Sequence, residues 1–200
     1  MINLATGGIS TLASSSSGTN SAAAWSPNGQ QIAFASSRSG NSEIYVLDVA
    51  TKATRKITNH WGIDTEPAWT ADGNSVIFTS GRSGKPNIYI VSASGGEPRR
   101  LTFTGDENGD ADVSPDGQTI AAVRDGGVAV LNQNGQLIRT LYASGFDESP
   151  SFSPNGDMVL FGIKQGYNGS LVVSSADGRA KQTLSALSGN VGDAVWSPIR

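Results

Sequence analysis

The sequence predicts an all-β fold, a β-propeller built from four-stranded blades. A similar segment recurs four times along the 200 residues, and each copy contains a turn of the type Ser-Pro-Asn-Gly or a close variant. No stretch shows a sustained helical period. Four-stranded units that recur about every 40 residues are the signature of a propeller. The four segments begin at Ala22, Glu66, Asp110 and Ser149, and a fifth start, DAVWSP, begins at Asp193.

An anchor residue, apolar in every copy, holds the same place in each segment. The anchors are Trp25, Trp69, Val113, Phe152 and Trp196, with spacings of 44, 44, 39 and 44 residues. We expect the four aromatic anchors to pack in the core between blades. A further apolar residue follows each complete anchor seven positions later, namely Ile32, Val76, Ile120 or Val159. The alternative, a β-sandwich of irregular strands, would not produce this fixed register.

Each repeat divides into four short strands. The first strand ends at the anchor, and the turn after it leads directly into the second strand, because proline presets φ and Asn-Gly or Asp-Gly tolerates positive φ. Polar, glycine-containing segments at 37–43 and 81–87 connect the second strand to the third. Polar turns at 50–54 and 94–98 lead to the fourth strand. Strands that lie between neighbouring sheets are apolar on both faces, so their alternation is imperfect.

The repeats predict a single domain over residues 1–200, with four complete blades and one split blade. The complete blades are expected at about 20–58, 64–102, 108–141 and 147–184. The same offsets place residues 1–12 and 190–200 in the split blade, which is incomplete. Either the ring closes over this incomplete sheet or it stays open with bare edge strands.

Composition excludes several classes of function. With 14 Lys and Arg against 17 Asp and Glu, the net charge of −3 argues against nucleic-acid binding. The absence of cysteine excludes disulfides and thiolate chemistry. The single histidine, His60, is not accompanied by the G-x-S-x-G nucleophile motif that a Ser-His-Asp triad of the hydrolase type requires. We therefore expect the protein to have no catalytic activity and no metal site. No apolar run is long enough to span a bilayer, and the first residues lack the features of a signal peptide.

Several longer motifs carry a family resemblance. They are IDTEPAW (63–69), SASGGEPRRLTFTG (92–105), NGDADVSPDG (108–117), FDESPSFSPNG (146–156), SSADGRAKQTLSA (174–186) and AVWSP (194–198). In this order they resemble the β-propeller of the TolB family, the periplasmic component of the Tol–Pal envelope system of Gram-negative bacteria. The resemblance covers essentially the whole chain. It implies the later part of a six-bladed propeller, truncated on its N-terminal side, without the family's signal peptide and N-terminal domain.

The resemblance also implies a function. Proteins of this family support cell-envelope integrity and outer-membrane constriction at division, and their propeller binds the lipoprotein Pal and, in some members, disordered colicin arms. Contact with TolA is not expected, because the family makes it through the absent N-terminal segment. The alternative is the substrate-gating propeller of a prolyl-oligopeptidase-like or tricorn-like peptidase without its catalytic domain. Such propellers lack the DTEP, GDADVSPDG and FDESPSF series together.

The loops that precede the first strands are expected to meet at one mouth of the central channel. They gather the acids Asp64, Glu66, Asp110, Asp147, Glu148 and Asp193. Like charges around one opening create a negative potential that attracts a basic partner or a cation. The resemblance adds Thr19, Asn20, Ala22 and Thr65 as positions of contact with Pal, although Ala22-Ala23 departs from the commoner Ala-Pro. The competing interpretation of each residue is a local cap on its own loop backbone.

A mouth rich in oxygen atoms could also hold Ca²⁺. No compact loop with EF-hand spacing is present, however, so the expectation is a site without a cofactor.

Overall fold

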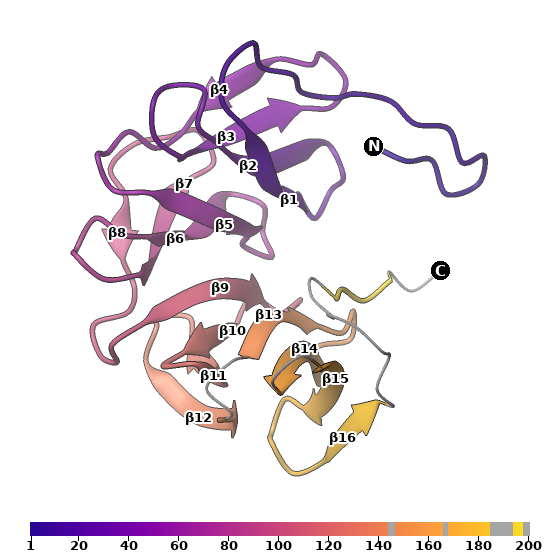
Figure 1. The fold of residues 1–200 in the computed structure, drawn as a ribbon, viewed down its shortest axis with the longest axis vertical. Coiled ribbons are helices and arrows are strands. Elements are labelled where there is room, and N and C mark those ends of the chain that lie inside the picture. Colours follow the sequence, from indigo (N-terminus) through magenta and orange to yellow (C-terminus); the bar gives the residue numbers. More distant parts are fainter. Residues whose placement is uncertain (144–146, 166–167, 185–193, 198–200) are drawn as a thin grey trace.

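The computed structural model describes residues 1–143, 147–165, 168–184 and 194–197, with four antiparallel sheets of four strands each in this part of the chain (Figure 1). Blade 1 contains β1 (Asn20–Trp25), β2 (Gln31–Ser36), β3 (Glu43–Asp48) and β4 (Thr54–Lys56). Blade 2 contains β5 (Asp64–Trp69), β6 (Ser75–Ser80), β7 (Asn87–Ser92) and β8 (Arg99–Arg100). Blade 3 contains β9 (Asn108–Val113), β10 (Thr119–Arg124), β11 (Gly127–Asn132) and β12 (Leu137–Tyr142). Blade 4 contains β13 (Asp147–Phe152), β14 (Met158–Gln165), β15 (Asn168–Ser175) and β16 (Lys181–Leu184).

The four blades follow one another around a common centre, and in each sheet the strands pair in chain order. The first strands, β1, β5, β9 and β13, lie innermost, and the fourth strands lie outermost (Figure 1). This arrangement confirms the predicted all-β propeller of four-stranded blades.

The turn between the first and second strands forms for the predicted reason. In blade 3 the Asp116 carboxylate accepts hydrogen bonds from Ser114 Oγ at 2.6 Å and from the Gln118 amide at 3.0 Å. Gly117 follows with a φ of +72°, which a residue without a Cβ adopts freely. The side-chain bonds and the glycine together reverse the chain directly after the anchor.

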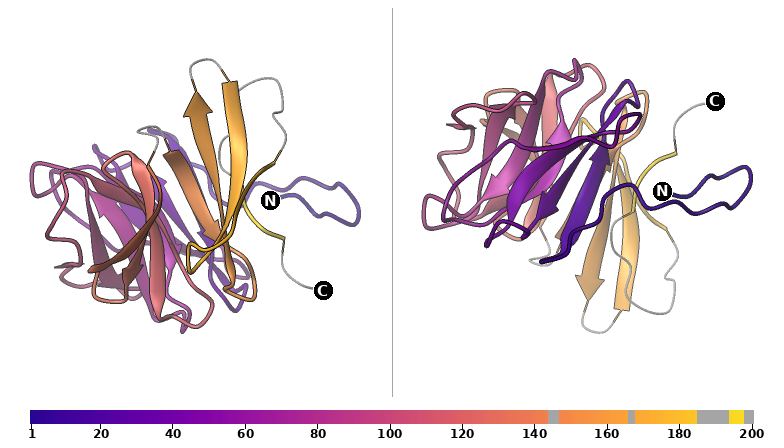
Figure 2. Two further views of the ribbon diagram at one scale, coloured as in Figure 1. Left: turned by 90° about the horizontal axis from the view of Figure 1, so that it is seen from below. Right: turned by 90° about the horizontal axis from the view of Figure 1, so that it is seen from above.

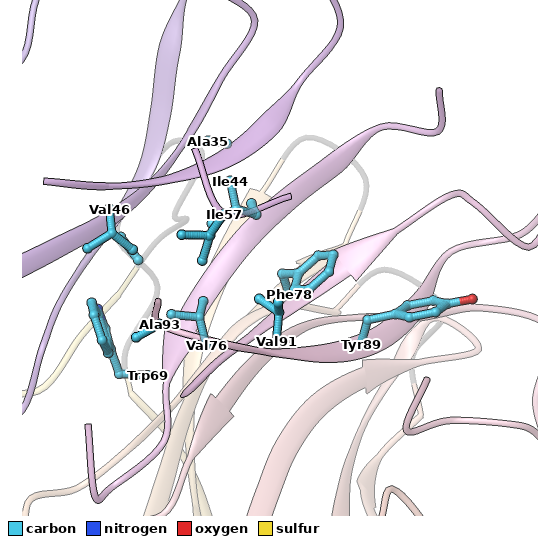
Figure 3. Packing of buried hydrophobic residues seen from close by; sticks show 11 residues of the cluster. Ala35, Ile44, Val46, Ile57, Trp69, Val76, Phe78, Tyr89, Val91 and Ala93 are labelled. Carbon is cyan, nitrogen blue, oxygen red and sulfur yellow. The ribbon is translucent and has the colours of Figure 1, made fainter. Parts of the chain in front are cut away.

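The hydrophobic core lies between neighbouring blades. At the boundary of blades 1 and 2, Trp69 packs beside Val46, Val76 and Ala93 (Figure 3). Its indole Nε1 donates a hydrogen bond to the Ala24 carbonyl of blade 1 at 3.1 Å. This anchor therefore connects blade 2 to blade 1.

Two further tryptophans show how this anchor depends on a neighbouring sheet. Trp196 repeats the contact of Trp69, donating from Nε1 to the Ser151 carbonyl of blade 4 at 3.0 Å. Trp25, which the repeat predicts to be buried core, is 50% exposed because no sheet in the described part of the chain packs on that face of blade 1. The expectation that the aromatic anchors pack in the core is therefore wrong at Trp25.

The first residues form a short hairpin that belongs to none of the four sheets. Ile2 and Ile9 make an isolated bridge, and Met1 and Ser10 exchange two backbone hydrogen bonds. Figure 2 shows the hairpin projecting away from the blades. Most of the segment 190–200 lies outside the described residues, so its predicted pairing with residues 1–12 stays a prediction. In the part of the chain described, no helix is long and apolar enough to cross a membrane.

Candidate partner-binding channel

Each of the four inner strands contains a β-bulge at the same repeat position. The bulged residues are Ala22, Glu66, Asp110 and Ser149, with φ values of 48°, 51°, 44° and 50°. The pairing register of each inner strand with its neighbour shifts at this point. A bulge redirects side chains near the end of a strand, and here it sets how the residues next to the channel are presented.

The acidic side chains at the bulges connect neighbouring blades. Glu66 Oε2 accepts hydrogen bonds from Thr79 Oγ1 of its own blade at 2.7 Å and from the Asp110 amide of blade 3 at 2.9 Å. Asp110 Oδ2 in turn accepts one from the Ser149 amide of blade 4 at 2.7 Å. Ala22, at the equivalent place in blade 1, has no carboxylate to make this bond. Both acids therefore serve the contact between blades as well as carrying charge.

A cavity of about 630 Å³ lies between the inner strands. Among the described residues that line it are three carboxylates, Glu66, Asp110 and Asp112, and no basic side chain. The remaining lining residues are small or weakly polar: Ala22, Ala23, Ala24, Thr65, Pro67, Ala68, Ala111, Ser149, Pro150, Ser151, Ala194 and Val195. Such a surface combines a negative charge with room for an inserted segment or loop.

The predicted site residues fall into distinct environments. Thr65, Glu66, Asp110 and Ala22 line the cavity, and the first three are partly buried. Thr19 and Asn20 lie at the exposed start of β1, where the Thr19 amide donates to Ser37 Oγ and Asn20 Oδ1 accepts from Arg38. Asp147 and Glu148 belong to β13, but their side chains lie outside the described part of the chain, as does all of Asp193.

Asp64 is not at the surface of the mouth. Its side chain is completely buried and pairs with Arg82 at 2.8 Å, while Ser80 Oγ donates to its other oxygen at 2.5 Å. The Arg82 guanidinium also stacks over Phe78 and Tyr89. The structure thus gives Asp64 a role within blade 2.

Asp112 is a channel residue that the predicted site does not include. Its two carboxylate oxygens accept hydrogen bonds from the amides of Val113 at 2.9 Å and of Phe152 in blade 4 at 2.8 Å. Desolvation by the surrounding strands outweighs these bonds and raises the pKa of Asp112 to about 6. The only sequence signal that places Asp112 in the channel is the repeat alignment. Residue 112 is equivalent to Ala24, Ala68 and Ser151, all of which line the cavity.

Replacing Asp112 by asparagine is expected to remove a pH dependence of the protein's stability. The pKa of this carboxyl is higher in the folded than in the unfolded state, so its contribution to stability is present below about pH 4 and is lost as the pH rises through 6. Asparagine loses one of the two backbone hydrogen bonds at every pH, but it carries no charge at either pH. Relative to the wild-type protein, the free energy of unfolding of Asp112→Asn should therefore be about 1–3 kcal/mol higher at pH 8 than at pH 4. Urea unfolding of both proteins at pH 4 and pH 8 measures this difference. An equal difference between the two proteins at both pH values would show that the charge has no effect.

In the described part of the chain, no group of three or more His, Cys, Asp or Glu side chains is placed to hold a metal ion. The carboxylates of the channel are instead hydrogen-bonded to backbone amides of the neighbouring blades. The arrangement is a carboxylate-lined surface held by bonds between blades, which is chemically suited to attract a positively charged group.

The fold and the cavity define a β-propeller whose inner strands line a cavity that contains three carboxylates. The family model described as "TolB beta propeller domain" matches residues 1–200. The chain therefore belongs to the TolB β-propeller domain family. It is 45% identical over 226 aligned residues to the Tol-Pal system protein TolB of Xanthomonas oryzae pv. oryzae, an alignment that covers 88% of this chain and 52% of the relative.

Solved structures agree with this assignment. The crystal structure of TolB from Acinetobacter baumannii superposes with a TM-score of 0.89 at 38% identity, covering 99% of this chain and 51% of that protein. Puromycin hydrolase, at a TM-score of 0.66 and 17% identity over 82% of this chain and 28% of its own, shares the fold alone. This chain spans about half the length of the curated relatives it matches.

Proposed function

We propose that this chain is the partner-binding propeller of a Tol–Pal system and binds the lipoprotein Pal at its channel, in the periplasm and without catalysing a reaction. The observation that supports the proposal most strongly is the cavity of about 630 Å³, which takes residues from all four blades and includes Thr65 and Glu66. Membership of the TolB propeller family supports the system and the compartment. The proposal assigns no metal and no cofactor to the site.

Within the proposed site, Thr65 is the residue best placed to meet a partner. It is partly buried on the cavity wall, and its hydroxyl makes no hydrogen bond within the described part of the chain. Glu66 and Asp110 carry negative charge at the same wall while each holds an amide of the next blade. A partner loop can therefore bind without displacing the contacts that connect the blades.

The proposal is tested by titrating the 200-residue chain with the soluble domain of Pal in a calorimeter. Saturable one-to-one binding is expected. Thr65→Tyr, which fills part of the cavity, should weaken binding by about tenfold or more, since a well-packed contact commonly contributes about 1–3 kcal/mol. The matched control is Gln30→Tyr, which adds the same ring to the exposed turn between β1 and β2, away from the cavity.

Thermal unfolding must first show that each variant keeps its fold. The absence of binding heat from a folded chain would contradict the proposal of Pal as partner. Equal losses of affinity in Thr65→Tyr and Gln30→Tyr would contradict the channel as the site.

A further inference from the structure

A second cavity, of about 500 Å³, lies between blades 2 and 3 at the far end of β5 from Thr65. Its rim contains the turn residues Asp72, Asp116 and Asn134, and Arg99 stands beside them. Its apolar wall consists of Ile77, Ile90, Leu101, Val113 and Ile120. The channel and this second cavity have no lining residue in common.

The cavity exists because this boundary lacks the usual aromatic anchor. The five wall residues hold the repeat positions of Ala33, Val46, Ile57, Trp69 and Val76 at the boundary of blades 1 and 2. There the Trp69 ring fills the space and is 6% exposed, and Phe152 does the same between blades 3 and 4. Val113 is too small to do so. Ile90 and Val113 consequently stay partly exposed, whereas Val46 is completely buried.

An arginine contact is missing at the same boundary. Arg55 pairs with Val46 across the sheet, and its guanidinium donates to the Ala93 carbonyl of the next blade at 2.8 and 3.0 Å. Arg139 holds the same position in blade 3 and donates to the Asp177 carbonyl of blade 4. Arg99 is the equivalent in blade 2, but its exposed guanidinium makes no hydrogen bond or ion pair with any residue that the structure describes.

The other two boundaries thus each contain an aromatic ring beside an arginine that donates to a backbone carbonyl. The boundary of blades 2 and 3 has space for an aromatic ring, and in Arg99 it has a donor for a carbonyl oxygen. We propose that this cavity binds an extended polypeptide segment, whose aromatic residue inserts against Ile90 and Val113 while Arg99 donates to a carbonyl of the segment. The cavity volume is within the range of ligand-binding pockets. An indole or phenol ring also buries a large apolar area while its polar group finds a partner.

The probe for this site is N-acetyl-L-tryptophanamide, which combines the ring with two amide carbonyls. It is titrated into the ¹⁵N-labelled 200-residue chain, and amide chemical shifts are recorded. We expect saturable shifts around residues 70–75 and 113–120, with a dissociation constant on the order of 1 mM. Indole, which has the ring alone, should bind about fivefold more weakly, and N-acetyl-L-alaninamide should cause no saturable shift.

Substitutions separate the two parts of the site. Val113→Trp places at this boundary the ring that Trp69 supplies between blades 1 and 2, and it should abolish binding. If the indole prevents folding, Val113→Phe, which copies the anchor Phe152, is used instead. Arg99→Gln should weaken N-acetyl-L-tryptophanamide about fivefold and leave indole unchanged. The control is Arg179→Gln, which removes an exposed arginine from blade 4 and should change nothing.

Three results would overturn the proposal. The first is the absence of saturable shifts in the wild-type chain. The second is undiminished binding to a folded Val113→Trp or Val113→Phe variant. The third is equal affinity for indole and N-acetyl-L-tryptophanamide, together with no effect of Arg99→Gln. The last result would indicate a site for small aromatic molecules. Pal and N-acetyl-L-tryptophanamide are separate probes of two cavities that have no lining residue in common. Failure of Pal binding and failure of this site are therefore distinguishable.

Discussion

Replacing Asp64 by alanine is expected to lower the free energy of unfolding by about 3–5 kcal/mol, because it breaks a buried ion pair by removing one partner. Asp64 is completely buried, and its carboxylate is bonded to Arg82 and Ser80. Without it the Arg82 side chain, which is only 13% exposed, keeps its positive charge with the Ser80 hydroxyl as its remaining hydrogen-bond partner among the described residues. Urea unfolding monitored by circular dichroism measures the loss.

The chain offers a matched control for this substitution. Asn20 holds the same position in blade 1, where its amide oxygen accepts from Arg38 at 2.9 Å in an exposed setting. Asn20→Ala should cost less than about 1 kcal/mol, since exposed hydrogen bonds contribute little. Equal effects of the two substitutions would contradict the assignment. If Asp64→Ala instead abolished Pal binding without loss of stability, Asp64 would be a partner contact, as the sequence predicts.

Gly135→Ala is expected to destabilise the protein by about 3 kcal/mol, from a strained backbone and an overlap between blades. Gly135 has a φ of +78° in the turn between β11 and β12. A Cβ there would overlap the carbonyl oxygen of Leu101 in blade 2 and lie 2.6 Å from its carbonyl carbon. Backbone cannot move aside as a flexible side chain can, so the two blades would have to separate. The midpoint of urea unfolding measures the effect.

Gly178 isolates the contribution of this close approach. It holds the same turn position in blade 4 with a φ of +73°, but an added Cβ would meet only side-chain carbons at ordinary distances of 3.5 and 3.7 Å. Gly178→Ala should therefore cost only the backbone strain, about 1–2 kcal/mol. If both alanine variants lost the same stability, close packing of blades 2 and 3 at Gly135 would be disproved as the cause.

The site was less predictable from sequence than the blades. Repeat positions predict that Glu66 and Asp110 lie near one opening, and in the structure they line one cavity together with Thr65. The repeat positions do not reveal that Asp64, two residues before Glu66, is buried in an ion pair within its own blade. A carboxylate beside a strand looks the same in sequence whether it meets solvent or an arginine that follows it by 18 residues.

The same limit applies to the anchors. Val113 is apolar and fits the core position as well as Trp69 does, yet only packing shows that the smaller side chain leaves an apolar cavity beside it. Trp25 matches Trp69 in type and position, but half of it is exposed because burial requires a neighbouring sheet.

By itself, the sequence determined the class of fold, the four complete blades and the order of their strands. These follow from the repeat period and from turn chemistry, both of which act between residues close together in the chain. The tertiary structure alone decided which carboxylates face the channel, which hold a neighbouring blade and which are buried in a pair. Those outcomes depend on the bulges and on hydrogen bonds to amides 39 to 44 residues away, such as Glu66 with Asp110 and Asp110 with Ser149. Bonds of this kind form only when whole blades pack side by side.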